Sequence, residues 1–503
     1  MAATVSTVTA SAPATEGRLT TEIELEPSTA PGRPPASSNT SLEAPDSAST
    51  EDKQDAPNTT RATGIVVALC GVSCLNTLGS GILTIALPKM AKDLDLPQDL
   101  LLWPASVYAL SAGCLLLLFG NLGDIFGPKV IWVLGSFLFL VFTLACGLSQ
   151  TAAQLITFRT VLGLAIAMCL PTAPLGYSVG LILGGVFADT IGWRYGYYIS
   201  AILNAPLCAI AIWALPAPRP KKKSRRVALL KDIDWTGTVL ISASLGFLSY
   251  ALARLSQSYQ GLSNVATAVL FALSIALFPV FVFWMRYQER RQRPAIVPIS
   301  LWKNAIFSTI CGVVFLCWGV FNAFQYFTSL YLQLVQDNTA LQTSIRFIPM
   351  AVVGAATNIL TGFLVDKVRV RPLVVASAVI TTASPIIMAF SEPSWNYWLG
   401  PFFAITLSPL HPDVLFTVSN LVVSAAYPGE SQGLAGAVFN TISQLGNSVG
   451  LAVLSAIASS VTAHDADKSL QAGYRVAYWI MFAAMVVVIL ASWLGLRKAE
   501  KAG

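Results

Sequence analysis

Long hydrophobic runs alternate with short polar connections from residue 64 to residue 496. Each run has roughly 18–25 residues or slightly more, the length that an α-helix needs to cross about 30 Å of hydrocarbon. The longest runs have room for tilting or kinking. The pattern predicts an all-α membrane protein with about 14 transmembrane helices, at 64–87, 101–119, 130–148, 155–173, 175–192, 195–215, 235–253, 263–285, 305–332, 342–365, 372–390, 397–426, 432–461 and 474–496.

The first 60 residues lack any such run and are rich in Ala, Ser, Thr, Pro and Glu. This composition predicts a disordered tail, and we expect no cleavable signal peptide because no apolar stretch precedes Gly64. The whole chain is 55% hydrophobic and only 11% charged. A soluble protein carries about 25% charged residues, so the composition excludes an ordinary cytosolic enzyme.

Basic residues gather on alternate connections between the predicted helices. With the N-terminal tail inside, the cytoplasmic connections and the C-terminal tail hold nineteen Lys and Arg residues, including Lys129 and the cluster at 221–226, and the opposite connections hold five. Cytoplasmic loops of membrane proteins are enriched in Lys and Arg, so no nucleic-acid partner is needed to explain the net charge of +6. We expect both termini in the cytoplasm and the chain in the plasma membrane, with the vacuolar membrane as the alternative.

The order of these segments divides the chain into five regions. Eight cysteines without a CxxC pair and two histidines predict neither a disulfide framework nor a metal site, and we expect no cofactor. The regions are a disordered cytoplasmic tail (1–60), a bundle of six helices (61–215, shortened at 171–175), basic loops with two extra helices (216–304), a second bundle of six helices (305–496) and a cytoplasmic C-terminal tail (497–503).

A short polar motif occurs twice, after the second and after the tenth predicted helix. A single copy is only a polar turn, but recurrence at matching positions indicates duplicated halves, as many transporters have. We interpret the motif as a conformational gate. Its residues are Gly120, Leu122, Asp124, Gly127 and Lys129 in the first copy, and Gly362 and Asp366, in the same G-x-L-x-D register, in the second.

The fifth predicted helix carries glycines four residues apart. Small residues at this spacing lie on one helix face and let another backbone approach closely, so helix packing is part of their role. The glycines are Gly176, Gly180, Gly184 and Gly185.

Charged residues inside membrane spans are costly and mark candidate functional sites. Arg159 either reaches the membrane surface or has a functional role inside the span. His411 and Asp413 lie midway along a proline-containing span, and both are candidates for proton coupling. Asp413 is either a structural hydrogen-bonding group or a proton carrier. Asp189 lies near the end of its span, beside Trp193 and Arg194, and we interpret it as an interfacial anchor.

Polar and aromatic side chains also occur together in the ninth predicted helix. This set suits a mid-sized amphipathic ligand, and it equally suits ordinary packing between helices. The candidate substrate-binding residues are Trp318, Asn322, Gln325 and Tyr326.

These motifs together resemble the major facilitator superfamily, and within it the fungal fourteen-spanner drug:proton antiporters of the aminotriazole-resistance-like branch. Residues 120–129 look like motif A of the family, Phe158-Arg159 with Gly163 looks like motif B, and residues 176–185 look like motif C. The resemblance implies a major facilitator fold, with two pseudo-symmetric six-helix bundles and two extra central helices. It also implies a role for Arg159 in proton coupling.

The sequence departs from the family pattern at three places. Leu181 stands where motif C usually has proline, and Asn76 stands where many relatives carry an acid. Motifs B and C are separated by only twelve residues, whereas relatives have about thirty more. At 1.5 Å per residue, 155–173 and 175–193 each span about 28 Å, so two minimal crossings fit with almost no loop. A shortened gene model or a splice variant is the alternative explanation.

The chain contains no Walker A, G-x-S-x-G or H-E-x-x-H motif, which argues against ATP-driven pumping and against an enzyme. We expect a proton-coupled exporter of small organic compounds such as drugs, toxins or secondary metabolites. Its expected partners are a small-molecule substrate, protons and the lipid bilayer, and we expect a monomer. The alternatives are facilitated movement of a small polar solute such as ammonium or borate, and a non-transporting sensor or inactive truncated variant.

Overall fold

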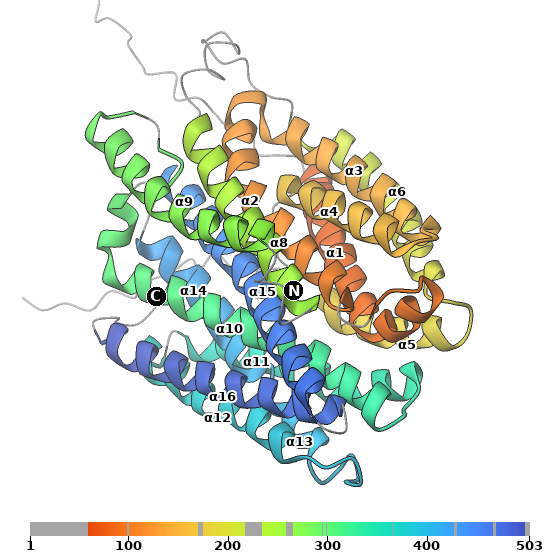
Figure 1. Ribbon diagram of the computed structural model, residues 1–503. Helices are drawn as coiled ribbons and strands as arrows, with labels where there is room; N and C mark the ends of the chain where they lie inside the picture. The colour runs from red at the N-terminus through yellow and green to blue at the C-terminus, as the bar shows by residue number, and fades with distance from the viewer. Residues whose placement is uncertain are drawn as a thin grey trace, which may run out of the picture. The chain divides into compact units, whose positions relative to one another are not determined.

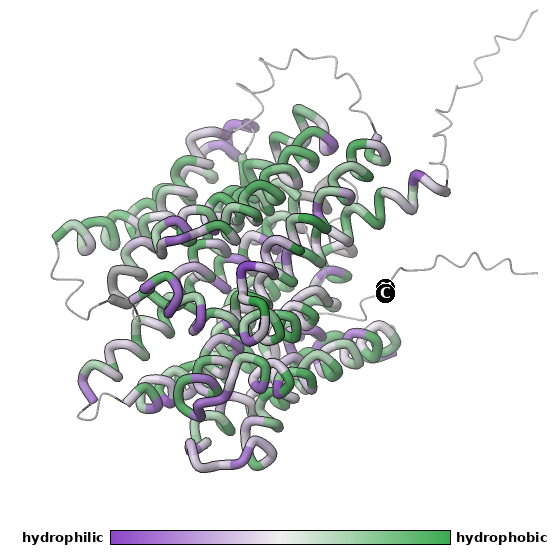
Figure 2. The backbone as a smooth tube through the Cα atoms, turned by 90° about the vertical axis from the view of Figure 1, so that its right-hand side faces the viewer, coloured by the Kyte–Doolittle hydropathy of each residue, from purple (hydrophilic) through white to green (hydrophobic). Residues whose placement is uncertain are grey.

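The computed structural model describes residues 59–97, 100–169, 175–216, 234–257, 265–293, 295–297, 299–365, 367–426, 430–465 and 469–497. Every regular element in these ranges is helical. Hydrophobic residues dominate the helices, with hydrophilic residues at intervals along them (Figure 2). A helix pairs its own backbone N–H and C=O groups, which is what a segment inside a bilayer requires.

The helices form a first half, a central pair and a second half. The first half comprises α1 (Thr59–Asp93), α2 (Trp103–Phe126), α3 (Pro128–Leu148), α4 (Ala152–Cys169), α5 (Leu175–Asp189) and α6 (Arg194–Ala214). The central pair is α8 (Trp235–Gln257) and α9 (Val265–Arg290), followed by η3 (Ile299–Lys303). The second half comprises α10 (Ala305–Leu330), η4 (Tyr331–Val335), α11 (Ala340–Leu364), α12 (Val370–Phe390), α13 (Pro401–Leu407), α14 (Leu410–Ala426), α15 (Glu430–His464) and α16 (Leu470–Gly495).

Twelve segments of the described chain are long and apolar enough to cross a membrane. Two shorter apolar helices, Gly176–Asp189 and Trp235–Leu248, complete the predicted fourteen. The prediction of an all-α membrane protein is therefore confirmed. One predicted span is broken, because α13 ends at Leu407 and α14 starts at Leu410. Pro409 lies at this break and cannot donate a backbone hydrogen bond.

The two halves repeat the same pattern of helix packing. In the first half α1 packs on α5 and α6, and α4 packs on α2 and α3. In the second half α10 packs on α15 and α16, and α14 packs on α11 and α12. Figure 1 shows α3, α4 and α6 together in one half and α12, α13 and α16 together in the other. The halves meet where α2 packs on α15 and where α5 packs on α11, so α5 and α15 are equivalent helices, as are α2 and α11.

The motif glycines lie where helix backbones approach most closely. A Cβ atom at Gly176 or Gly180 would meet the backbone of α1 at Cys74 or Leu78. The equivalent helix α15 does the same, since a Cβ at Gly446 would meet the backbone of Phe315 in α10. Close helix packing of this kind depends on residues without side chains, so the glycine spacing positions α5 against α1.

Helix α5 is much shorter than its counterpart in the second half. It has 15 residues, whereas α15 has 35. At 1.5 Å per residue, α5 covers about 22 Å, less than the thickness of the hydrocarbon core. Its first turn already contacts Cys74, in the middle of α1. The described helix is thus shorter than the predicted crossing at 175–192, because it ends at Asp189.

Candidate functional site

A cavity of about 240 Å³ lies between the two halves. Its walls come from α1, α2, α4 and α5 of the first half and from α10, α11, α14 and α15 of the second. All four predicted substrate-binding residues line it: Trp318, Asn322, Gln325 and Tyr326. Among the described residues that line this cavity, the charged side chains are Arg159 and Asp413.

Arg159 is buried in the first half, with 1% of its surface exposed. Its Nε and Nη2 atoms have no hydrogen-bond partner among the described residues. The guanidinium carbon lies 5.2 Å from the ring centroid of Tyr108 and 5.8 Å from that of Tyr197. Cation–π contacts of this kind stabilise a cation but leave its N–H groups free to donate. The side chain therefore stays in the protein interior and does not reach the membrane surface.

Asp413 lies in the first turn of α14, on the opposite wall of the cavity. A Cβ atom built on Gly354 of α11 would lie 2.9 Å from its Oδ2 atom, and the Asn358 side chain is a hydrogen-bonding neighbour of the carboxylate. Within the described chain no basic side chain lies at ion-pair distance from Asp413. The cavity thus holds an acid and a base that are not paired with each other.

Arg159 and Asp413 occupy equivalent places in the two halves. Arg159 lies on α4 and contacts Tyr108 of α2, and Asp413 lies on α14 and contacts Gly354 of α11. Because α4 and α2 correspond to α14 and α11 in the repeated packing, the duplicated fold places one charge of each sign on facing walls.

His411 is fully buried, but it does not line the cavity. Its Nδ1 atom lies 3.0 Å from the Ser377 hydroxyl of α12, and its backbone N–H donates to the Thr381 hydroxyl. The structure therefore separates two residues that are adjacent candidates in the sequence: Asp413 lines the cavity, and His411 joins α14 to α12.

Hydrogen bonds join the halves at the end of the cavity where α1 ends and α11 begins, which we call the closed end. Ser329 and Gln333 of the second half donate to the backbone carbonyls of Thr84 and Ile85 in α1. Ser344 of α11 donates to the carbonyl of Leu181 in α5 at 2.8 Å. These bonds hold α1 and α5 against α10, η4 and α11.

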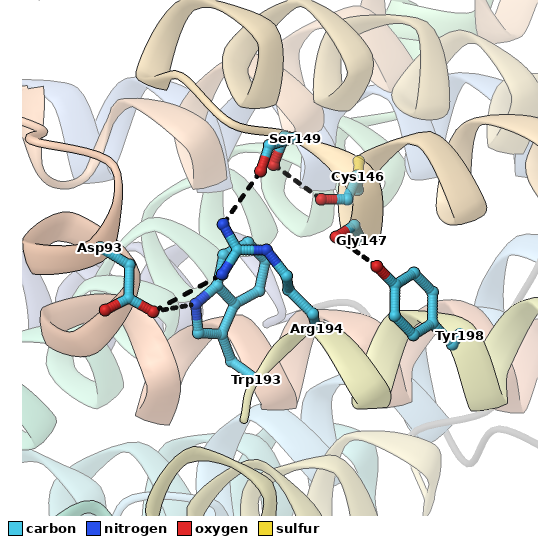
Figure 3. Close-up of polar contacts among 7 residues, drawn as sticks. All are labelled: Asp93, Cys146, Gly147, Ser149, Trp193, Arg194 and Tyr198. Carbon is cyan, nitrogen blue, oxygen red and sulfur yellow. Dashed lines mark hydrogen bonds and ion pairs between the residues drawn. The ribbon is translucent and has the colours of Figure 1, made fainter. Parts of the chain in front are cut away.

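At the same end, a polar cluster joins three helices of the first half (Figure 3). Trp193 Nε1 donates to the Asp93 carboxylate at 2.9 Å, and Arg194 lies 3.7 Å from the same oxygen. Arg194 also donates to the carbonyl of Ser149 after α3, and the Tyr198 hydroxyl donates to the carbonyl of Gly147. The cluster connects the ends of α1, α3 and α6 into one unit.

The predicted gate motif lies at the opposite end of the first half. Gly127 has a φ of 95°, a left-handed value that favours glycine, and it separates α2 from α3. The Lys129 ammonium group donates to the carbonyls of Ile212 and Leu215 at the end of α6, so it binds within its own half. Gly120 and Gly362 have open space where a Cβ atom would lie. The Asp124 side chain and Asp366 lie outside the described residues.

The glycines of the predicted antiporter motif face two different neighbours. Gly176, Gly180 and Gly184 face α1. A Cβ atom on Gly185 would instead meet Ala340 and Ser344 of α11 in the second half. The motif therefore supports both the packing within the first half and its contact with the second.

Sequence reasoning missed a polar stripe on α15. The cavity is lined by Asn440, Ser443, Gln444 and Asn447 of this helix. Spacings of three and four residues place these side chains on one helical face. Polar residues at this spacing inside an apolar span indicate a polar helix face, so the sequence contained a signal for this part of the site. Asn358 carried no such signal, because only the packing of α11 on α14 brings it to Asp413.

Comparison with known protein families gives one extensive match. The family model described as Major Facilitator Superfamily matches residues 69–174 and 172–451. The two matched segments overlap at residues 172–174, between α4 and α5.

Three curated proteins illustrate the range of similar sequences. MFS-type transporter 1 of Pyricularia oryzae is 46% identical over 521 residues, covering 88% of this chain and 85% of its own. The low affinity ammonium transporter of Saccharomyces cerevisiae is 26% identical, covering 75% of this chain and 77% of its own. Efflux pump terJ of Aspergillus terreus is 23% identical, covering 82% and 84%. The first alignment is longer than the 503 residues of this chain, so that relative contains segments that this chain lacks.

Among solved structures, the nucleoside transporter NupG is similar with a TM-score of 0.55. The similarity covers 86% of this chain and 99% of NupG at 12% sequence identity. At this identity the comparison supports the fold alone.

Proposed function

The chain belongs to the major facilitator superfamily of membrane transporters, and from that premise we propose that it is a proton-coupled exporter of small organic compounds. Membership makes it a multi-pass membrane transporter and not an enzyme. The observation that carries the proposal is the cavity between the halves, with Arg159 and Asp413 on facing walls.

The lining of the cavity favours an organic substrate. Trp318 packs edge-on against Phe321 and Phe416, with ring centroids 5.9 Å and 6.2 Å apart, and all three line the cavity. Ligand sites for organic molecules combine such apolar walls with a few polar groups. Similarity to efflux pump terJ supports export, and the fourteen-helix arrangement supports the fungal drug:proton antiporter branch.

Asp413 is the proposed proton carrier. Burying a carboxylate inside a bilayer-spanning bundle costs free energy, so a carboxylate at this place is a candidate functional group. Taking up a proton removes its charge, so protonation biases the balance between conformations that expose the cavity to opposite sides. Arg159 is the fixed positive charge on the facing wall.

We propose that the closed end faces outward in the plasma membrane, with both termini in the cytoplasm. The exposed turn at Gln292 belongs to a basic connection, and the exposed residue Asn396 follows α12 on the other side. An impermeant thiol reagent applied to intact cells should label Asn396→Cys and leave Gln292→Cys unlabelled. Labelling of Gln292→Cys alone would reverse the orientation.

Expression in yeast that lacks its own drug exporters tests the function. Export predicts resistance to some members of a panel of organic toxins, with resistance lost in Asp413→Asn at equal protein abundance. The purified protein in vesicles should then export the protective compound only when a proton gradient drives protons in the opposite direction. Release that ignores the gradient, or full coupling in Asp413→Asn, would contradict the proposal.

The second candidate is movement of ammonium, which rests on similarity to the low affinity ammonium transporter. Uptake of this kind predicts increased sensitivity to methylammonium and no gain in resistance to organic toxins. The same cells therefore distinguish the two functions.

A further inference from the structure

The two walls of the central cavity differ in chemistry. The first half contributes Arg159 together with hydroxyl and amide groups, from Asn76, Thr77, Ser80 and Tyr177. The second half contributes Asp413, an aromatic cluster and amide and hydroxyl groups of α10, α11 and α15, so the two walls differ chiefly in the sign of their charge. Arg159 and Asp413 are the charged residues among the described cavity lining, so the cavity is polarised from one half to the other.

Part of the Arg159 guanidinium group on the wall of the first half has no hydrogen-bond acceptor among the described residues. An arginine side chain stays charged and has five N–H donors in a planar fork. Two of the three guanidinium nitrogens of Arg159, Nε and Nη2, have no hydrogen-bond partner among the described residues. The Tyr108 hydroxyl donates to Asn76 Oδ1, and the Arg159 guanidinium carbon lies over the ring of Tyr108. A carboxylate has the oxygen geometry that binds two adjacent N–H groups of arginine.

The wall of the second half has the chemistry that binds an organic ammonium group. Phe416 follows Asp413 by three residues on α14, so both side chains lie on one helix face. Trp318 packs against Phe416 with ring planes 80° apart. A negative oxygen next to aromatic faces attracts a cation both by charge and through the ring quadrupoles.

We propose that the cavity binds amphipathic zwitterions about the size of a dipeptide, whose two charged groups lie at opposite ends of the molecule. The carboxylate of the substrate binds Arg159, its ammonium group binds Asp413, and its apolar body packs on Trp318, Phe321 and Phe416. This substrate class rests on the export function proposed above.

The arrangement also gives a mechanism for exchange. The ammonium group of the substrate and a proton compete for the same carboxylate of Asp413. A substrate bound from inside leaves when a proton arrives from outside, and the proton leaves when the next substrate binds. Arg159 keeps its charge throughout and selects the carboxylate end.

Equilibrium binding to the full chain in lipid nanodiscs tests the substrate class without any gradient. The probes are alanyltryptophan and alanylphenylalanine, each with its methyl ester, which lacks the carboxylate, and its N-acetyl derivative, which lacks the ammonium group. We expect each zwitterion to bind at least about ten-fold more tightly than either derivative. Failure of both zwitterions to bind, or equal binding of zwitterion and methyl ester, overturns the proposal, and this comparison needs no variant.

Two variants assign the ends. Removing one partner of a buried charge pair typically weakens binding by about 30-fold or more. Arg159→Gln should weaken the binding of the zwitterions by this factor and change the affinity for the methyl esters by less than about two-fold. Asp413→Asn should weaken the binding of the zwitterions but not that of the N-acetyl derivatives. Arg291→Gln is the matched control, because Arg291 stacks on Tyr287 with 4.6 Å to the ring centroid but lies outside the cavity. An equal effect of Arg159→Gln on zwitterion and ester overturns the assignment.

Binding and export fail in different ways. A chain that exports a compound in vesicles but binds neither zwitterion overturns the substrate class alone. A chain that binds the zwitterions through Arg159 but moves them without regard to the proton gradient overturns proton-coupled export alone.

Discussion

The Asp189 carboxylate accepts a hydrogen bond from the backbone N–H of Leu341 at 2.7 Å. Asp189 ends α5 in the first half, and Leu341 lies in the first turn of α11 in the second. Thr339 and Gln342 cap other N–H groups of this turn. A carboxylate at a helix N-terminus also gains from the helix dipole. Asp189 is therefore a contact between the halves at the closed end, and its interpretation as an interfacial anchor stays a prediction.

Asp189→Asn should weaken the closed end. Loss of a charge-assisted hydrogen bond at an exposed position costs about 1 kcal/mol, which shifts the balance between open and closed ends by about five-fold. Distances between spin labels on α5 and α11 should broaden toward longer values. Asp93→Asn is the matched control, because it removes contacts with Trp193 and Arg194 inside the first half only. Equal broadening in both variants would remove the specific role of Asp189.

Two glycines of α1 should respond differently to the same substitution. A Cβ atom on Gly81 would lie 2.7 Å from the backbone nitrogen of Leu181, whereas Gly79 has nothing within 4 Å. Gly81→Ala should lower stability by about 1–3 kcal/mol through overpacking, and Gly79→Ala should leave it unchanged or slightly raised. Thermal unfolding of the purified variants measures the difference. Equal unfolding temperatures would mean that α1 and α5 are not this close.

His411→Asn should lower stability but preserve the pH dependence of transport. The substitution disturbs the contact with Ser377 between α14 and α12, and losing one buried hydrogen bond costs about 1 kcal/mol. Proton-driven export per molecule should match that of the unchanged chain, in contrast to Asp413→Asn. Loss of coupling in a well-folded His411→Asn variant would transfer the proton-carrying role to His411.

Exchange of one proton for one zwitterion moves one net positive charge inward. Membrane potential should therefore drive export even without a pH gradient, because a charge crossing 100 mV gains about 2.3 kcal/mol. Vesicles with a potassium diffusion potential, negative on the side that loses substrate, should show faster export than vesicles at zero potential. An electroneutral exchange, with no response to potential, would exclude this stoichiometry.

Restoring the length of α5 should stabilise the first half. The equivalent helix α15 has 35 residues against 15 in α5, and the part of α1 before Cys74 extends beyond the first described turn of α5. Replacing residues 170–174 by the corresponding segment of the Pyricularia oryzae relative should raise both the unfolding temperature and transport. A Gly/Ser insert of equal length should do neither. If the relative's segment raises neither quantity, the short helix is sufficient for stability and transport.

The sequence alone was enough to predict the membrane class, the helix count and the duplication. Hydrophobic runs are long enough to be unambiguous because the bilayer requires a minimum helix length. The paired G-x-L-x-D strings at 120–124 and 362–366 exposed the repeat. The cost of a charge inside the membrane was also sufficient to single out Arg159 and Asp413.

Only the tertiary structure decided which candidates share a site. His411 and Asp413 are two residues apart, yet they face α12 and the cavity respectively, because successive helical positions point about 100° apart. The contact of Asp189 with Leu341 joins residues 152 positions apart, and no local pattern records it. A chain determines which segments enter the membrane by local hydrophobicity, but which side chains meet depends on how the helices of the two halves pack against one another.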